Sequence, residues 1–221
     1  MSHKPKFEKD YYERCASEGM DYAYYGNWQK QYVKMVIFVT QIYMNDLSNK
    51  VFLDVGTACG ATLLAFKETK IFEKCIGIDT SEFLVALGNE KFNFKKGELI
   101  VENSTTMESI KDNSIDLLHC SQLFEYLSES DANITLEQFK RVMKTGSIGF
   151  INISTIKEKQ NKSQLTMLSE KVWKEKIKEY GFTLKKDTIK LMKQAAFFPG
   201  NDKRNFYEHY IDDWSVFTLT K

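Results

Sequence analysis

The apolar positions of the chain fall into one helical pattern followed by a series of short, strand-like runs. Between Trp28 and Tyr43 they recur every three or four residues, which predicts a helix that ends near Asn45. The later runs are unbroken and too short for surface helices, so they predict strands. These runs are KVFLDV (50–55), CIGID (75–79), ELIVE (98–102), IDLLHC (115–120) and SIGFINI (147–153).

Helical patterns alternate with these runs, at 61–70, 82–92 and 131–143. Crossovers of this length predict a parallel sheet with helices on both faces. Near the end, SEKVWKEKIKEYGF (169–182) predicts a helix closed by Gly181. TLKKDTIKLM (183–192) and DDWSVFTLTK (212–221) then predict two consecutive strands that pair antiparallel. We therefore expect an α/β fold with a doubly wound, seven-stranded, mostly parallel sheet and an antiparallel last strand.

Length, charge and cysteine spacing narrow the class of protein. The 221 residues suit one domain, and 31 lysines and arginines against 30 aspartates and glutamates disfavour nucleic acid or an anionic membrane as partner. The charged start lacks the apolar core of a signal peptide, and no uncharged run approaches the ~18 residues of a membrane span. The cysteines show no metal-ligand spacing, which predicts reduced thiols in a cytoplasmic protein without a metal site.

LDVGTACG (53–60) places two glycines in the loop after the first strand, where an open parallel sheet binds its ligand. Gly56 can adopt a positive φ, and Gly60 lets the next helix start close to the strand. The loop does not match the dinucleotide fingerprint GxGxxG, because Ala58 replaces the second glycine. Asp79 ends the next strand, nineteen residues beyond Gly60, and can accept both hydroxyls of a ribose. Their joint spacing predicts a cofactor site.

These motifs resemble those of class I S-adenosylmethionine-dependent methyltransferases. LDVGTACG and GIDTSE (77–82) are similar to the family's first two motifs, and SIDLLHCSQLFEYL (114–127) to its fourth-strand segment. FKRVMKTGSIGFINI (139–153) is similar to the segment usually written arginine-valine-leucine-lysine-proline-glycine-glycine, with Thr145 and Ser147 in place of the proline and the second glycine. The resemblance covers roughly residues 48–155. It implies a Rossmann-like fold, S-adenosylmethionine as cofactor and S-adenosylhomocysteine as product.

Position by position, the resemblance implies a set of cofactor contacts. Asp54, Gly56 and Gly60 would face the methionine part, and Asp79 would hold the ribose. Asn103 stands where the family often has an aspartate that reaches the adenine; a helix N-cap is the alternative role for Asn103 and its neighbours. The full set is Asp54, Gly56, Thr57, Gly60, Asp79, Thr80, Asn103, Ser104, Ser121 and Gln122, the last two beside the reacting methyl group.

A general base is optional, because the methyl group is already activated and positioning can supply much of the rate. The candidates for an amine or hydroxyl acceptor are His119, Glu125, Tyr126 and His209. His119 lies within a predicted strand, so packing is its alternative role. Tyr126 stands where relatives often carry a histidine.

Two aromatic segments outside the shared core are candidates for acceptor binding. In DYYERCASEGMDYAYYGNWQKQY (10–32), Tyr25 and Trp28 would cover the pocket as a lid, or else pack the first helix, as we expect for Tyr32. In AAFFPGNDKRNFYEHYIDD (195–213), the acceptor residues would be Phe198, Tyr207 and His209, with a dimer contact as the alternative.

We expect a single methyltransferase domain over 1–221, with a helical cap or lid (1–46), a cofactor-binding core (47–155) and a C-terminal helix, strand pair and substrate loop (156–221). The expected function is O- or N-methylation of a small-molecule acceptor, and a homodimer is possible. One alternative is a non-catalytic S-adenosylmethionine-binding or scaffolding protein of the same fold. Others are a protein or RNA methyltransferase and, disfavoured by Ala58 and the antiparallel ending, a nicotinamide oxidoreductase.

Overall fold

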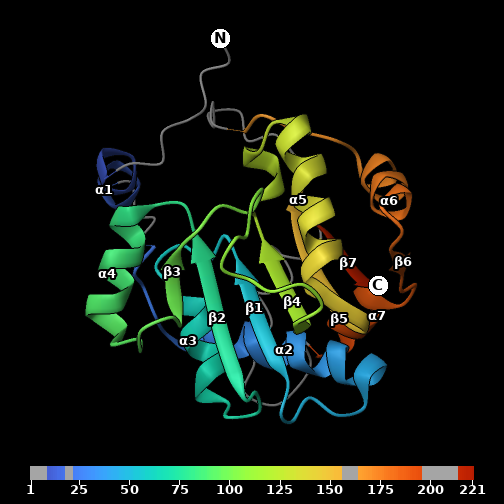
Figure 1. Ribbon diagram of the computed structural model, residues 1–221, viewed down its shortest axis with the longest axis horizontal. Helices are drawn as coiled ribbons and strands as arrows, with labels where there is room; N and C mark the ends of the chain where they lie inside the picture. Colours follow the sequence, from blue (N-terminus) through green and yellow to red (C-terminus); the bar gives the residue numbers. More distant parts are fainter. Residues whose placement is uncertain (1–8, 18–21, 156–163, 196–213) are drawn as a thin grey trace.

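The computed structural model describes residues 9–17, 22–155, 164–195 and 214–221. At its centre is a seven-stranded sheet with the order β3-β2-β1-β4-β5-β7-β6 (Figure 1). β7 pairs antiparallel with both β5 and β6, and the other pairings are parallel. The predicted mostly parallel sheet with an antiparallel last strand is therefore confirmed. The strands are β1 (Val51–Val55), β2 (Lys74–Asp79), β3 (Leu99–Val101), β4 (Ile115–Ser121), β5 (Met143–Ser154), β6 (Thr183–Leu184) and β7 (Trp214–Thr220).

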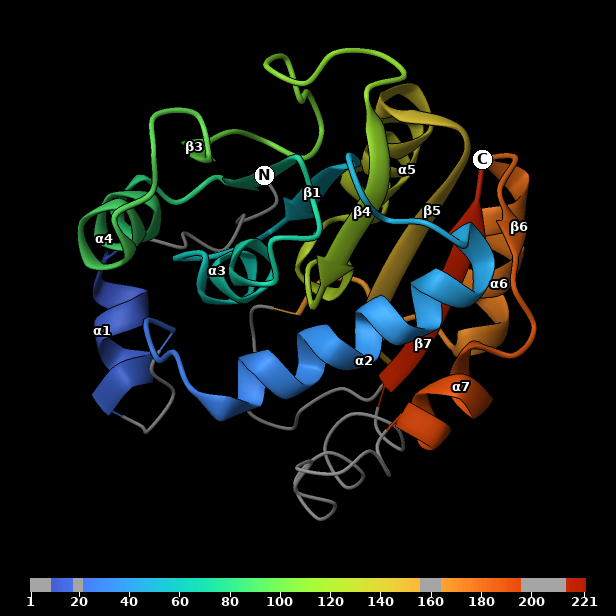
Figure 2. The same cartoon turned by 90° about the horizontal axis from the view of Figure 1, so that it is seen from below.

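Helices cover both faces of the sheet (Figures 1 and 2). Those that pack on one face include α2 and α3, and α5 and α6 pack on the other. The helices are α1 (Lys9–Ser17), α2 (Asn27–Met44), α3 (Ala61–Glu68), α4 (Glu82–Phe92), α5 (Glu129–Val142), α6 (Glu170–Glu179) and α7 (Thr188–Ala195), with a short 3-10 helix η1 (Phe124–Tyr126) after β4. Among the described residues, no helix is both long and apolar enough to cross a membrane.

The two faces have separate apolar cores, because successive side chains of a strand point to opposite sides of the sheet. Phe52, Leu117 and Phe150 pack beneath α2 and α3. Their neighbours Leu53 and Leu118 pack with α5 and α6 on the other face. The central strands thus present apolar side chains on both sides, which explains why they appear in the sequence as unbroken apolar runs.

Most predicted elements lie where the apolar pattern placed them. The helix predicted from Trp28 is α2, and its C-cap is Asn45 in a positive-φ conformation. The amphipathic helix before Gly181 is α6, which buries Trp173 and Ile177.

The strand predicted at 183–192 is wrong. Only Thr183 and Leu184 pair with β7, and the chain then turns into α7. Ile189 and Met192, three residues apart, lie on one side of this helix and pack into the core beneath α2. A helix therefore intervenes between the last two strands, because burial against α2 determines the structure there.

Strand order places the ligand edge of the sheet between β1 and β4. From β1 the chain moves outward to β2 and β3, then returns to the other side of β1 as β4. Crossovers on the two sides of this point run in opposite directions, and open α/β sheets bind ligands there, outside the carboxyl ends of the strands. The loops after Val55, Asp79, Val101 and Ser121 all lie at this edge.

Candidate cofactor and methyl-transfer site

The glycine loop is held in a fixed turn between β1 and α3. Gly56 has φ +72° and Gly60 φ +82°, in the left-handed region that favours glycine. The backbone amides of Gly56 and Thr57 donate to the Ile78 carbonyl, at 2.9 and 3.1 Å, so the loop is fastened to β2. Ala58 adopts φ +53°, although it has a Cβ atom. Strained residues of this kind cluster at ligand-binding loops.

Asp79 connects the end of β2 to the same loop. Its carboxylate accepts the Ala58 amide at 2.8 Å and the Ser81 amide at 2.9 Å. Burial raises the pKa of Asp79 above the usual range for an aspartate, although these hydrogen bonds oppose the shift. Thr80 is exposed, and Ser81 caps α4 through a hydrogen bond to the Leu84 amide.

Asp54 lies at the centre of a buried hydrogen-bonded chain. Thr57 donates its hydroxyl to Oδ2 at 2.6 Å, and Nδ1 of His119 lies 2.6 Å from Oδ1. On the other side of the imidazole, Nε2 lies 2.7 Å from the Tyr32 hydroxyl. Asp54 and His119 are each 2% exposed, and Tyr32 is 1% exposed. Neighbouring strands position the first two, since Asp54 of β1 is in register with His119 of β4.

The ends of β4 and β5 form the other half of the edge. Ser121 is in register with Asn152, and the Gln122 amide donates to the Asn152 carbonyl at 2.9 Å. Gln122 has φ +55°, a second non-glycine residue in the left-handed region at this edge. The Asn152 side chain is fully buried. Neither of its amide atoms meets full hydrogen-bond geometry with a described residue, although the Tyr32 hydroxyl lies near enough to interact with the amide. Buried groups without a well-formed hydrogen bond are rare and often belong to binding sites.

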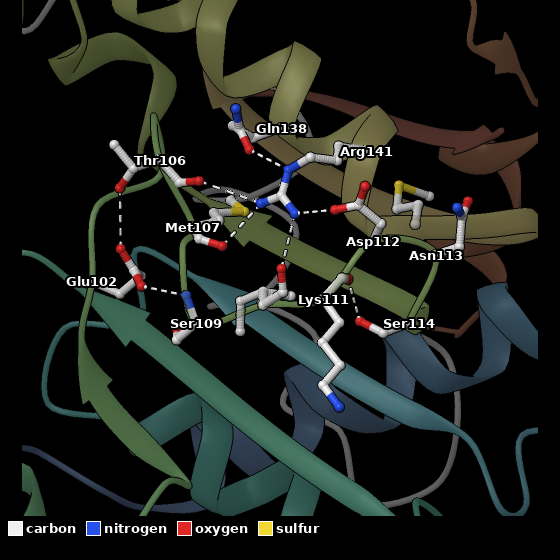
Figure 3. A network of polar contacts seen from close by, with 12 residues as sticks. Glu102, Thr106, Met107, Ser109, Lys111, Asp112, Asn113, Ser114, Gln138 and Arg141 are labelled. Carbon is white, nitrogen blue, oxygen red and sulfur yellow. Dashed lines mark hydrogen bonds and ion pairs between the residues drawn. The ribbon is translucent and has the colours of Figure 1, made fainter.

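Arg141 of α5 anchors the loop between β3 and β4 (Figure 3). Its guanidinium donates to the carbonyls of Ile110 and Met107, both at 2.9 Å, and to the Asp112 carboxylate at 2.5 Å. The same guanidinium bonds the carbonyl of Thr106 and the side chain of Gln138. The loop carrying the predicted adenine contacts is therefore fixed from α5.

Within that loop, Asn103 and Ser104 have protein partners of their own. Oδ1 of Asn103 accepts the amide and the hydroxyl of Thr105, both at 3.0 Å. The Ser104 hydroxyl lies 3.0 Å from that of Thr135 on α5. Asn103 is exposed, whereas Ser104 is buried.

The N-terminal helix α1 packs against the cofactor edge. The Tyr12 ring stacks on Phe83 of α4 at 6.4 Å and meets Tyr22 edge-on at 5.0 Å. Burial raises the pKa of Tyr12, and the nearby charge of Asp79 raises it further. Burial also raises the pKa of Tyr22, and the nearby Tyr126 at the end of η1 raises it further. The segment therefore reaches from the end of β2 to η1.

The predicted lid residues Tyr25 and Trp28 each contact a different partner. The Tyr25 hydroxyl donates to Glu68, the last residue of α3, at 2.5 Å. Trp28 stacks on Tyr32 with ring centroids 5.5 Å apart. The packing that we expected of Tyr32 is present, together with the bond to His119. The other predicted acceptor residues, Phe198, Tyr207 and His209, lie outside the described residues.

Among the base candidates, His119 is engaged at both ring nitrogens, and Glu125 is a buried residue of η1. Tyr126 is half-buried at the end of η1. The sequence interpretation did not single out Tyr12, Arg141 or Asn152. The sequence did carry a signal for Asn152, which is a polar residue between the apolar residues Ile151 and Ile153 of a predicted strand.

The structure thus brings Asp54, Gly56, Thr57, Gly60 and Asp79 together at one edge, with Ser121 and Gln122 at the neighbouring strand end. Their contacts with the cofactor stay predictions. The chemistry of the groups fits it, since Asp79 accepts hydrogen bonds as ribose hydroxyls require and Asp54 supplies a buried carboxylate near a cationic ligand. No group of three metal-ligating side chains occurs among the described residues.

Known proteins provide an independent comparison. Residues 53–151 match the family model described as a methyltransferase domain. The chain is 28% identical over 159 residues to the release factor glutamine methyltransferase of Buchnera aphidicola subsp. Baizongia pistaciae. That match covers 68% of this chain and 56% of the relative, so the chain spans little more than half of that protein's length.

Solved structures share the fold at low identity. A chain of the complex between the Haloferax volcanii Trm112 methyltransferase activator and a methyltransferase gives a TM-score of 0.63 at 15% identity, covering 96% of this chain and 94% of that chain. Haemonchus contortus phosphoethanolamine N-methyltransferase 2, solved with S-adenosylmethionine, gives a TM-score of 0.59 at 15% identity. This match covers 85% of this chain and 52% of that chain. The domain match, carried on this sheet order with its glycine loop and Asp79 at the carboxyl edge, shows that residues 53–151 form a class I S-adenosylmethionine-dependent methyltransferase domain.

Proposed function

We propose that this methyltransferase acts on an oxygen or nitrogen of a small molecule that is enclosed at the carboxyl edge of the sheet. The observation that carries the proposal is the packing of α1 on this edge. Tyr12 and Tyr22 pack against Phe83 and the glycine-loop residue Cys59 in one apolar cluster. A covered site suits a small acceptor, whereas a protein or RNA acceptor needs an open approach to the methyl group.

S-adenosylmethionine supplies a methyl group that is already activated on a sulfonium. The chain's task is therefore to bind, orient and exclude water. Asp79 and the glycine loop would hold the nucleoside, and the loop held by Arg141 would contact the adenine. Ser121, Gln122 and the amide of Asn152 would orient the acceptor, because their strand ends lie beside the glycine loop.

A protein acceptor is the second candidate, since the relative at 28% identity is a release factor glutamine methyltransferase. The packing of α1 on the carboxyl edge opposes this candidate, because a protein acceptor needs an open approach to the methyl group.

The experiment combines binding and turnover. Purified protein is incubated with S-adenosylmethionine and, separately, a panel of small hydroxyl and amine compounds, a bacterial release factor, or an unmodified RNA. S-adenosylhomocysteine formation is measured, and products are examined by mass spectrometry for one added methyl group. Asp79→Ala serves as the control for dependence on the cofactor site.

We expect turnover with a member of the small-molecule panel and none with the macromolecules. Methylation of the release factor would replace the proposal with the protein acceptor. Stabilisation by S-adenosylhomocysteine in thermal unfolding, without turnover on any class of acceptor, would favour the non-catalytic binding protein.

A further inference from the structure

The side chains of Thr57, Asp54, His119 and Tyr32 form a continuous hydrogen-bonded network through an otherwise apolar core. Three aromatic rings surround the imidazole of His119, with centroids 5.6 Å (Phe66), 6.1 Å (Phe150) and 6.3 Å (Phe52) away. Within the described part of the chain, Asp54 is the charged group that bonds this ring. The ring therefore lies in a low-dielectric setting with one anionic partner.

The donors and acceptors along the network can be assigned from chemistry. An ionised carboxylate only accepts hydrogen bonds, so Nδ1 of His119 must carry the hydrogen that lies toward Oδ1 of Asp54. A neutral imidazole then has a bare Nε2, which accepts from the Tyr32 hydroxyl. The Asp54 carboxylate thus selects the tautomer with Nδ1 protonated, and the Tyr32 hydroxyl donates to the ring nitrogen that this tautomer leaves bare.

The charge of the pair matters for the ligand. S-adenosylmethionine carries a sulfonium and an ammonium group. The buried carboxylate of Asp54 lies one residue before the end of β1, the strand that leads into the glycine loop. With a neutral His119 the pair keeps a net negative charge that attracts these cations. An imidazolium would cancel that charge and remove the attraction.

We propose that His119 and Tyr32 are positioning residues for cofactor binding: the Nδ1–H of His119, whose ring is held at Nε2 by the Tyr32 hydroxyl, fixes the Asp54 carboxylate so that the pair presents one negative charge to S-adenosylmethionine. This inference rests on S-adenosylmethionine being the cofactor and does not depend on which acceptor is methylated. It also gives Tyr32 a role that packing alone would not require.

Three variants separate the parts of the network. His119→Asn keeps a nitrogen the same number of bonds from Cα as Nδ1, so the donor to Asp54 survives without an ionisable ring. His119→Leu removes the donor, and Tyr32→Phe removes only the hydroxyl. Cys120→Ala is the matched control, because Cys120 is equally buried on the same strand but lies in the core of the opposite face.

Affinities for S-adenosylmethionine and S-adenosylhomocysteine are measured by calorimetry, and unfolding of the ligand-free protein is measured separately. We expect His119→Leu to lose roughly tenfold or more in affinity, as for a lost hydrogen bond to a charged group. The loss should be larger for S-adenosylmethionine, which alone carries the sulfonium charge. His119→Asn should stay within a few-fold of wild type, Tyr32→Phe should weaken binding, and Cys120→Ala should change stability without changing affinity.

Nitrogen NMR of protein labelled at its three histidines reports the tautomer directly, with His119→Asn assigning the signal. We expect one protonated and one bare ring nitrogen at neutral pH, with Nδ1 protonated and the Nε2 signal shifted in Tyr32→Phe. A protonated imidazolium, or equal affinities in His119→Leu and His119→Asn, would overturn the proposal. If His119→Leu does not fold, the tautomer seen by NMR in wild type and the cofactor affinity of Tyr32→Phe still test the proposal. Wild-type protein that binds neither ligand would instead refute the cofactor itself.

Discussion

The backbone amide of Ala58 donates a 2.8 Å hydrogen bond to the carboxylate of Asp79. This bond joins the glycine loop after β1 to the end of β2, so the turn and the predicted ribose acceptor form one unit. Ala58 reaches it only by adopting φ +53°, which is unfavourable for a residue with a Cβ atom. The strain and the buried carboxylate lie at the same edge, as is common at functional sites.

Replacing Asp79 with asparagine should weaken S-adenosylhomocysteine binding by roughly tenfold or more, because a charged acceptor for the ribose hydroxyls is lost. Calorimetric titration of wild type and Asp79→Asn measures the difference. Glu82→Gln is a suitable control, since Glu82 is an exposed carboxylate in the first turn of α4. Unchanged affinity in Asp79→Asn would place the ribose elsewhere.

The raised pKa of Asp79 predicts opposite pH effects on binding and on stability. Burial is the main cause of the shift, so the folded, ligand-free protein binds the Asp79 proton more tightly than the unfolded chain does. As pH falls through the raised pKa, this group should stabilise the ligand-free fold. Over the same range the affinity for S-adenosylhomocysteine should fall, because a protonated carboxyl has lost an acceptor. The free energy of unfolding and the S-adenosylhomocysteine affinity are measured against pH in wild type and in Asp79→Asn, and the difference between the two proteins isolates the contribution of Asp79. If wild type and Asp79→Asn show parallel pH profiles, the prediction is wrong.

Ala58→Gly should raise the free energy of unfolding by about 1 kcal/mol, because glycine accepts the left-handed conformation without strain. The bond to Asp79 comes from the backbone, so cofactor affinity should not change. Denaturant unfolding provides the measurement. Ala86→Gly, at an exposed position of helix α4, should have the opposite sign. A loss of stability in Ala58→Gly would mean that the methyl group of Ala58 contributes packing that outweighs the strain.

Arg141→Lys should destabilise the protein by roughly 1–3 kcal/mol, since a single ammonium cannot replace a planar fork that bonds several carbonyls of one loop. Hydrogen exchange should accelerate at the amides of residues 103–110 (Figure 3). Glu137→Ala, on an exposed position of the same helix, is the control. Unaltered exchange in the loop would show that the loop holds its conformation without α5.

Asn152→Leu should increase thermal stability, because it removes a buried amide that forms no well-aligned hydrogen bond with the described residues. If that amide orients the acceptor, turnover should fall while S-adenosylhomocysteine affinity stays the same. Thr218→Val is a matched control, since its buried hydroxyl lacks a partner in the described structure but lies two pairs further from the strand end. If both variants are more stable than wild type and both keep full turnover, Asn152 has no role in the reaction.

The spacing of apolar residues was sufficient to predict an element where one interaction dominates its structure. The unbroken apolar runs of the central strands have a single structural solution, burial on both faces of a parallel sheet. The three-to-four spacing from Trp28 likewise fixed α2 and its end at Asn45. The pattern failed at 183–192, where lysines and apolar residues suited either a strand or a helix, and packing of Met192 under α2 determined the outcome.

The sequence by itself determined the glycine turn, the acidic residues at the ends of β1 and β2, and the family to which they belong, because these depend on backbone geometry and short spacing. Only the tertiary structure decided which distant residues share a site. Tyr32 and Asp54 meet through His119, and Arg141 meets the loop after β3, across separations that no local pattern encodes. The physical reason is that pairing of β1 with β4, and packing of α2 and α5 on opposite faces, bring these groups together only when the whole sheet has formed.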